Sequence, residues 1–329
     1  MLNMNQNQLN EYSAVIIDED IIFKSIIPNQ CEISVKALRK LSKKVSDSQI
    51  SQKIKRLLEL VKTESCIELD GFELDKDFSD DMPKEKDNAF DIPSFCEAKK
   101  FYVCKASKDN KLEDDMIYFL KSAELFKNVK YIMVSATADE KICRDYFGKR
   151  MVDFYQCKMA SYEGTLHQYP QKSMSRSSMA NNPGIVSKLM ARFGIDEDKV
   201  ITFMKENIGE LHFGNTEGSN TLEGEDILVI GTPYHADFIY KLAAFTMGLD
   251  FDEDEEMESL LVTNNGYRFW FTTYQNEDLR AVQFWMIESE FEQAVGRARL
   301  LRNPCKVDLF SNFPLRQAEM VEDFNFDAE

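Results

Sequence analysis

Residues 14–20 read Ala14-Val15-Ile16-Ile17-Asp18-Glu19-Asp20, an unbroken apolar run, mostly β-branched, that ends in three carboxylates. Such a run predicts a short strand buried on both faces, the kind that parallel sheets contain. Residues 129–134, which lead into Ser135-Ala136-Thr137, and residues 227–230 have the same character. We therefore expect an α/β fold built on parallel sheets.

Helical and strand patterns alternate in both halves of the chain. Apolar residues recur at helical spacing over residues 185–193, 236–247 and 279–301, and strands are expected at 200–204, 211–213, 267–274 and 307–310. Residues 161–182 are rich in Ser, Asn, Gln and Met and predict an exposed stretch without regular structure. The alternation predicts two parallel-sheet lobes, with residues 1–155 in the first and residues 156–329 in the second.

A long insertion separates the first two expected strands. Asp18 and Ser135 are 117 positions apart, so residues 33–128 are expected to form an insertion with helices at 33–62 and 112–126. Residues 32–62 contain nine Lys or Arg against three Asp or Glu. These basic helices either face phosphates, with Lys36, Arg39 and Lys43 as candidate nucleic-acid contacts, or form an ordinary solvated face. Two acidic stretches, residues 68–91 and 250–258, predict exposed loops.

The composition excludes several classes of protein. The chain has 329 residues, 57 acidic and 40 basic side chains and a formal net charge of −17. It has no run of about 18 apolar residues to cross a membrane and no secretory signal pattern, so we expect a cytoplasmic protein without a membrane partner. Its seven cysteines form no C-x-x-C pair and its three histidines no i, i+4 pair, which argues against a disulfide framework or a zinc site.

Three polar clusters are expected at the carboxyl ends of strands or at helix ends, where ligands of open parallel sheets bind. Asp18-Glu19-Asp20 follows the first strand, and one such carboxylate can hold Mg²⁺. Ser135 and Thr137 follow the second strand. Residues 293–299, Gln293-Ala294-Val295-Gly296-Arg297-Ala298-Arg299, end a long helix with an amide, a glycine and two guanidiniums. Guanidiniums there either meet phosphate charge or complement the helix dipole.

Taken together and in this order, the clusters resemble the motifs of superfamily 2 helicases, ATPases built from two RecA-like lobes. Residues 15–20 resemble motif II, the Walker B box, and residues 133–137, followed by Tyr146-Phe147-Gly148, resemble motif III. Residues 218–233 are similar to the motif V region of DinG-like helicases. Residues 293–299 match motif VI in the Q-x-x-G-R-x-R form of Dicer-type helicases. The ordered set spans residues 15–302, nearly the whole chain.

The resemblance implies an ATP-dependent DNA or RNA helicase or translocase, with ATP and Mg²⁺ as cofactors and single- or double-stranded nucleic acid as partner. In the first lobe, Asp18 would bind the Mg²⁺ of ATP through its water shell and Glu19 would position the attacking water. Ser135 and Thr137 would couple hydrolysis to movement of the lobes.

For the second lobe, the resemblance implies two groups of residues. Gln293, Arg297 and Arg299 would reach the γ-phosphate, with Arg297 as the arginine finger. The nucleotide would also be contacted by Gly296, Gly218 and Asn220, and the nucleic-acid strand by Ser219.

The sequence departs from the family pattern in one respect. Helicases of this kind carry G-x-x-x-x-G-K-[ST] before motif II to cradle the phosphates, and this chain contains no such motif. We therefore expect a first RecA-like lobe that is incomplete at its N-terminus and carries a helical insertion. ATP hydrolysis would then need a missing Walker A segment, supplied by a separate chain in a split helicase. A truncated gene reading and a catalytically inactive helicase-like module that binds nucleic acid or protein remain open, and so does whether the chain is an enzyme.

Overall fold

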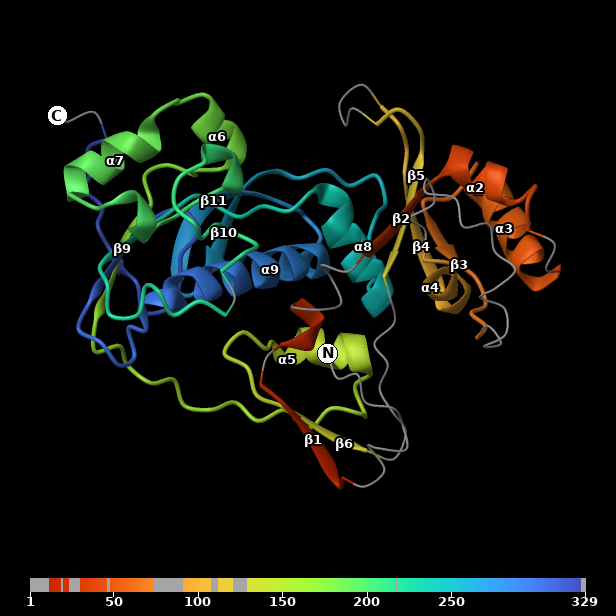
Figure 1. The fold of residues 1–329 in the computed structure, drawn as a ribbon, viewed down its shortest axis with the longest axis horizontal. Coiled ribbons are helices and arrows are strands. Elements are labelled where there is room, and N and C mark those ends of the chain that lie inside the picture. The colour runs from red at the N-terminus through yellow and green to blue at the C-terminus, as the bar shows by residue number, and fades with distance from the viewer. Residues whose placement is uncertain are drawn as a thin grey trace. The chain divides into compact units, whose positions relative to one another are not determined.

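The computed structural model describes residues 12–18, 20–23, 30–45, 48–73, 91–107, 112–120, 129–216 and 218–326 (Figure 1). The chain divides into two compact units. Unit 1 comprises Met1–Val152 and Ala236–Asp254, and unit 2 comprises Asp153–His235 and Glu255–Glu329. Residues 236–254 thus pack with the first part of the chain.

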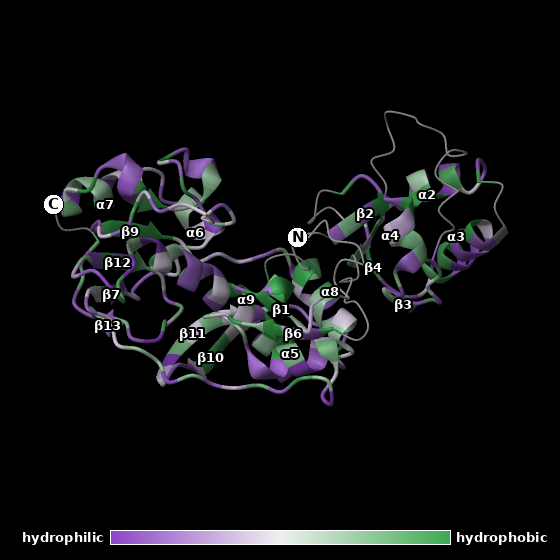
Figure 2. Ribbon diagram, turned by 60° about the horizontal axis from the view of Figure 1, so that its bottom comes forward, coloured by the Kyte–Doolittle hydropathy of each residue, from purple (hydrophilic) through white to green (hydrophobic). Residues whose placement is uncertain are grey.

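Unit 2 is built on a five-stranded sheet in the order β13-β7-β12-β9-β8, in which every neighbouring pair is parallel. All four residues of β9 (Ile227–Ile230), the strand between β12 and β8, are buried, as expected of a strand covered on both faces. Figure 2 shows this strand as hydrophobic. The other strands are β7 (Thr165–Tyr169), β8 (Val200–Ile201), β12 (Lys306–Phe310) and β13 (Glu319–Met320). The predicted α/β class with parallel sheets is confirmed.

Unit 2 also contains the α-helices α6, α7 and α9 and a β-hairpin. Helices α6 (Arg176–Ala180) and α7 (Ile185–Phe193) precede β8, and the hairpin strands β10 (Glu258–Asn264) and β11 (Tyr267–Thr273) precede α9 (Glu277–Val295). The Asn276 side chain caps α9 by accepting hydrogen bonds from the backbone N–H groups of Asp278 (2.9 Å) and Leu279 (3.0 Å). The ring of Phe284 on α9 packs 5.6 Å from that of Phe271 on β11, so helix and hairpin share one core.

The expectation of an exposed, irregular stretch at residues 161–182 is wrong, because β7 lies inside the sheet. Its Gln168 is fully buried, and the amide nitrogen donates to the carbonyl oxygens of Ser311 (2.8 Å) and Phe313 (2.7 Å). The amide oxygen of Gln168 accepts from the N–H of Leu315 at 3.0 Å. A polar residue in the sequence thus serves as a core residue, because three backbone groups satisfy its amide.

Unit 1 contains the first predicted strand as one of two parallel strands, β1 (Ala14–Ile17) and β6 (Lys130–Met133), followed by helix α5 (Glu140–Phe147). The prediction of burial on both faces is wrong for β1. Val15 is buried, but Ile16 is 71% exposed. Neighbouring side chains point to opposite faces of a strand, so the face of β1 that carries Ile16 is not covered by the residues that the structure describes.

The insertion between β1 and β6 contains helices, as predicted, and also a sheet that the sequence prediction did not include. It holds a four-stranded antiparallel sheet in the order β2-β5-β4-β3. β5 replaces part of the helix expected at 112–126, whose residues 121–126 lie outside the described ranges, as do residues 74–90 of the acidic stretch. The elements are β2 (Gln30–Ser34), α2 (Val35–Leu41), α3 (Ser48–Leu60), β3 (Cys66–Glu68), α4 (Ile92–Glu97), β4 (Lys100–Cys104) and β5 (Met116–Leu120).

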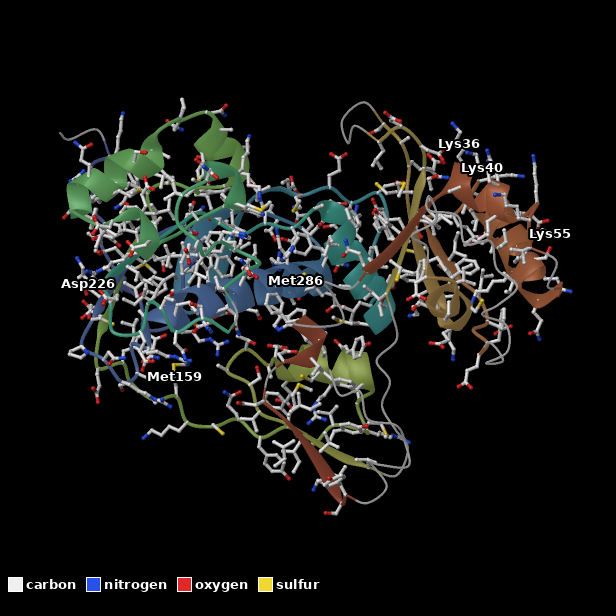
Figure 3. The ribbon with its side chains drawn as sticks, viewed as in Figure 1. Lys36, Lys40, Lys55, Met159, Asp226 and Met286 are labelled. Atoms are coloured by element: carbon white, nitrogen blue, oxygen red, sulfur yellow. The ribbon has the colours of Figure 1, made fainter. Side chains whose placement is uncertain are left out.

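One of the basic residues of this insertion is structural. Lys53 on α3 is buried, and its Nζ donates to the backbone oxygens of Asp70 (3.0 Å), Cys96 (2.8 Å) and Ala98 (2.6 Å). Burial lowers the pKa of Lys53 to about 8. The exposed Lys36, Lys40 and Lys55 instead project from α2 and α3 (Figure 3).

Helix α8 (Asp237–Met247) packs against the insertion sheet in unit 1. The ring of Phe238 stacks on that of Tyr118 with centroids 4.0 Å apart, and Lys100 Nζ donates to the carbonyl oxygen of Phe245 at 2.7 Å. The acidic run that follows is only partly a solvated loop. The Glu253 carboxylate accepts hydrogen bonds from the N–H groups of Ser65 (3.1 Å) and Cys66 (3.2 Å). This acidic side chain therefore binds the backbone at the start of β3 and does not only face solvent. Across the described ranges, no helix combines the length and apolar character needed to cross a membrane.

Candidate functional site

The first candidate cluster lies where β1 and β6 end. The two strands are parallel with Ile17 opposite Met133, and the N–H of Val134 donates to the carbonyl oxygen of Ile17 at 2.8 Å. Asp18 and Ser135 therefore leave the sheet at the same carboxyl edge. Strand pairing across the 117-position interval brings these two candidates together.

Ser135 and Thr137 form a local turn at this edge. Their hydroxyl oxygens are 3.2 Å apart, and the N–H of Thr137 donates to Ser135 Oγ at 3.1 Å. Asp139 then caps α5 by accepting from the N–H of Ile142 at 3.0 Å. The two hydroxyls are thus oriented by the turn and by the start of the helix behind it.

The carboxylates that follow β1 differ in how far they are exposed to solvent. Asp18 is exposed, whereas Asp20 is 2% exposed and accepts hydrogen bonds from the N–H groups of Ile22 (2.9 Å) and Phe23 (3.2 Å). Glu19 lies outside the described residues. Burial, with the carboxylates of Asp20 and Asp139 nearby, raises the pKa of the Cys143 thiol on α5 to about 12. Of the two described carboxylates, Asp18 is the one that faces solvent.

The second candidate cluster joins the end of α9 to the loop that precedes β9. Arg297 donates from Nε to the backbone oxygen of Gln293 at 3.1 Å and from Nη1 to the backbone oxygen of Ser219 at 3.0 Å. Arg299 donates from Nη2 to Asn220 Oδ1 at 3.2 Å. The candidate residues of both segments are therefore in direct contact within unit 2.

The sequence prediction placed residues 293–299 at the end of a long helix and residues 218–226 before a strand, and both segments lie there in unit 2. Residues 218–220 precede β9 and residues 297–299 precede β12, and these strands are parallel neighbours. The cluster lies at their amino ends, where the N–H of Lys306 donates to Asp226 Oδ1 at 2.7 Å. Strand direction in the folded sheet, which the local pattern does not contain, decides the edge.

Backbone hydrogen bonds at Gly224 and Arg299 also hold this cluster together, and the sequence pattern did not predict them. The N–H of Gly224, at a φ of +79°, donates to the carbonyl oxygen of Ala298 at 3.0 Å. The carbonyl oxygen of Arg299 accepts from the N–H groups of Arg302 (2.9 Å) and Asn303 (3.1 Å). A glycine between two polar runs was the available sign of this turn.

Gly296, which the helicase resemblance places at the nucleotide, has open space beside its Cα. A Cβ at this position would meet no heavy atom within 4 Å, and the backbone has a helical φ of −60°. At Gly164, in contrast, a Cβ would run into the backbone oxygens of Cys305 and Asn303. The space beside Gly296 is open to a ligand, and the space beside Gly164 is filled by the chain itself.

We predict opposite effects on stability for alanine at these two glycines. Gly296→Ala should leave the free energy of unfolding unchanged or raise it by up to about 1 kcal/mol, because alanine suits a helical backbone. Gly164→Ala should lower it by about 1–3 kcal/mol, because backbone oxygens must move. Denaturant unfolding of both variants checks this, and a loss of stability in Gly296→Ala would show that its space is not open.

Glu292, which precedes Gln293 on α9, is another residue near the candidate site that the sequence prediction did not include. Burial, followed by the charge of Glu288, raises the pKa of Glu292 to about 7, while Arg316 acts in the opposite direction. At pH values between 4.5, the ordinary pKa, and about 7, the Glu292 carboxyl is therefore protonated in the folded chain and ionised in the unfolded chain. Stability from this group is lost as the pH rises through that window.

We predict that Glu292→Gln removes this pH-dependent loss. At about pH 8 the variant should be more stable than the parent by about 1 kcal/mol, and at about pH 5 the two should be equal. Denaturant unfolding at both pH values checks it. Glu277→Gln, at a side chain that is 90% exposed on the same helix, is the matched control, and the same pH response in both variants would contradict the prediction.

The solved structures that match most of the chain include three with XPD names. They are named XPD_APO (TM-score 0.46, 14% identity, 94% of this chain and 74% of that chain), XPD_Helicase (0.41, 14%, 91% and 64%) and S. tokodaii Xpd4 (0.43, 13%, 91% and 71%). No protein-family model matches the sequence. No curated protein matches it either. The functional interpretation therefore depends on the residues of the chain itself.

Proposed function

We propose that the chain is the motor part of a superfamily 2 helicase or translocase, which couples ATP hydrolysis to movement on DNA or RNA. One observation supports this above the others. Residues 218–220 and 297–299, which resemble motifs V and VI, contact each other through Arg297 and Arg299. If the two segments resembled helicase motifs only by chance, there would be no reason to expect them to contact each other.

The guanidiniums of this cluster suit a phosphate. Arg297 and Arg299 present forked donors, and one arm of each is fixed on a neutral oxygen, so the side chains are held in place before a ligand binds. We assign Arg297 the role of arginine finger and place Gln293 and Arg299 beside the γ-phosphate. Gly296 leaves room for the nucleotide, Gly218 and Asn220 contact it, and Ser219 contacts the strand.

The residues at the end of β1 fit the magnesium ion of ATP. Mg²⁺ keeps most of its water shell in such sites and needs only one or two carboxylates, and Asp18 is an exposed carboxylate. Ser135 and Thr137 stand at the same edge and can pass a change at Asp18 to α5 through their turn. The bound ion would neutralise phosphate charge, while Asp18 orients its water shell and Glu19 positions the attacking water.

ATP turnover by this motor needs a phosphate loop, which the given sequence does not contain and which a second protein can supply in an experiment. The proposal predicts ATP turnover only in a mixture with a protein that carries G-x-x-x-x-G-K-[ST]. Turnover should rise when single-stranded DNA or RNA is added. Binding of nucleic acid without turnover in any mixture would favour the helicase-like binding module instead.

We predict that Arg297→Ala lowers turnover of the active mixture by about 10³-fold or more, because an arginine finger stabilises charge in the transition state. Steady-state phosphate release, with melting curves to confirm folding, measures this. Arg302→Ala, at an exposed arginine of the next turn, is the matched control and should keep its turnover. Unchanged turnover in Arg297→Ala would remove the proposed role.

The basic helices of unit 1 are the proposed nucleic-acid contacts. Lys36, Arg39 and Lys43 are all exposed on or just after α2, and the structural Lys53 is not part of this surface. Each phosphate contact releases bound counterions, so the salt dependence of affinity counts the contacts.

We predict that the triple variant Lys36→Gln, Arg39→Gln, Lys43→Gln reduces the slope of log affinity against log salt by about two for single-stranded DNA. Fluorescence anisotropy at several salt concentrations measures the slope. A charge-matched triple variant at the exposed Lys158, Lys188 and Lys205 of unit 2 serves as the control. Equal slopes for the two variants would place the contacts elsewhere.

A further inference from the structure

The hairpin β10–β11 has one face in the core of unit 2 and one face in solvent. Val262 and Phe271 are buried, and Leu260 and Phe269 pack against the same core. The residues between them point the other way, because side chains alternate along a strand. The outer face consists of three directly opposed pairs: Leu261 with Trp270, Thr263 with Arg268 and Ser259 with Thr272.

Trp270 is unusual on this face because its side chain has no role in the core. It is 63% exposed, and its cross-strand partner Leu261 is 40% exposed. Its backbone is held in place, since the carbonyl oxygen of Trp270 accepts from Asn312 Nδ2 at 3.0 Å and both flanking residues, Phe269 and Phe271, pack inward. A large flat ring is thus presented to solvent by a rigid strand.

The chemistry around the ring favours a nucleic-acid base as its occupant. Of the six residues of the outer face, Arg268 is the charged one, three carry hydroxyls and none is a carboxylate. The nearest acidic residue along β10, Glu258, accepts a hydrogen bond from Gln275 Nε2 at 2.7 Å. An aromatic face beside a cation and hydroxyl donors matches a base and its phosphate. Two apolar side chains cover far less than the roughly 800 Å² that a stable protein interface needs from each partner.

We propose that this outer face is a stacking platform for one base of a single-stranded nucleic acid. Trp270 stacks on the base, Leu261 supports the edge of the ring, and Arg268 contacts the adjoining phosphate. The inference rests on the proposed function, because it takes the strand that the motor moves on as its ligand. It adds a contact outside every segment that resembles a helicase motif.

The chain contains a built-in probe of this contact. It has two tryptophans, and Trp285 on α9 is 6% exposed, so quenching by a bound strand reports on Trp270. The experiment titrates the full chain with oligothymidylate and with an abasic oligomer of equal length, which keeps the phosphates and lacks the bases. The proteins are the parent, Trp270→Ala, Trp270→Phe and Trp285→Phe.

Oligothymidylate should quench the parent and Trp285→Phe, and the abasic oligomer should quench neither. Trp270→Ala should bind oligothymidylate about tenfold more weakly and the abasic oligomer as the parent does, because only the stacking is lost. Trp270→Phe should keep most of the affinity, since it keeps an aromatic face. Equal melting temperatures of parent and variants exclude unfolding as the cause.

Three results would overturn the proposal. If the strand binds with full affinity to Trp270→Ala, the base does not stack there, and the proposed function stands without this contact. If tryptophan emission changes with protein concentration rather than with strand, the face joins two copies of the chain. If the parent binds no nucleic acid under any salt condition, the proposed function itself fails and the platform fails with it.

Discussion

The hydrogen bonds from Arg297 and Arg299 to residues 219 and 220 are the contact on which the functional interpretation depends. They join two loops that precede neighbouring parallel strands, β9 and β12, and Asp226 ties the starts of these strands together through the N–H of Lys306. The sheet fixes the distance between the loops. The position of the arginines therefore depends on the five-stranded sheet, because the sheet holds the two loops next to each other.

Some elements of the fold could be predicted to the residue, because their signals are local. The apolar run Ile227–Ile230 and the helical spacing of Ile185–Phe193 both agree with β9 and α7. Other strands were missed, and two of them in unit 2 show the physical reasons. β7 has a buried glutamine in place of an apolar residue, and β10 presents polar side chains to solvent. Asn265-Gly266, both at positive φ, was a hairpin signal between β10 and β11 that the prediction did not use.

The candidate site was only partly accessible from the sequence. Motif-like spacing selected the candidate residues, but three features of their surroundings depend on tertiary structure. Asp20 accepts hydrogen bonds from the N–H groups of Ile22 and Phe23 and is buried, although it is the same residue type as the exposed Asp18 two positions earlier. Ile16 is exposed although its strand is apolar throughout, because burial depends on what covers a strand and not on its composition. The raised pKa of Glu292 arises from packing and from Glu288, one turn away on α9.

The turn that follows α9 shows how the chain holds an arginine in place without neutralising it. Arg299 has a φ of +58°, a left-handed conformation that costs a residue with a side chain on the order of 1 kcal/mol. Its carbonyl oxygen accepts from the N–H groups of Arg302 and Asn303 and from Asn303 Nδ2, which offsets this cost. Its guanidinium bonds to the amide oxygen of Asn220, a neutral acceptor. A carboxylate there would hold Arg299 more firmly but would compete with a phosphate for it, so a neutral acceptor fixes the side chain while its charge stays available.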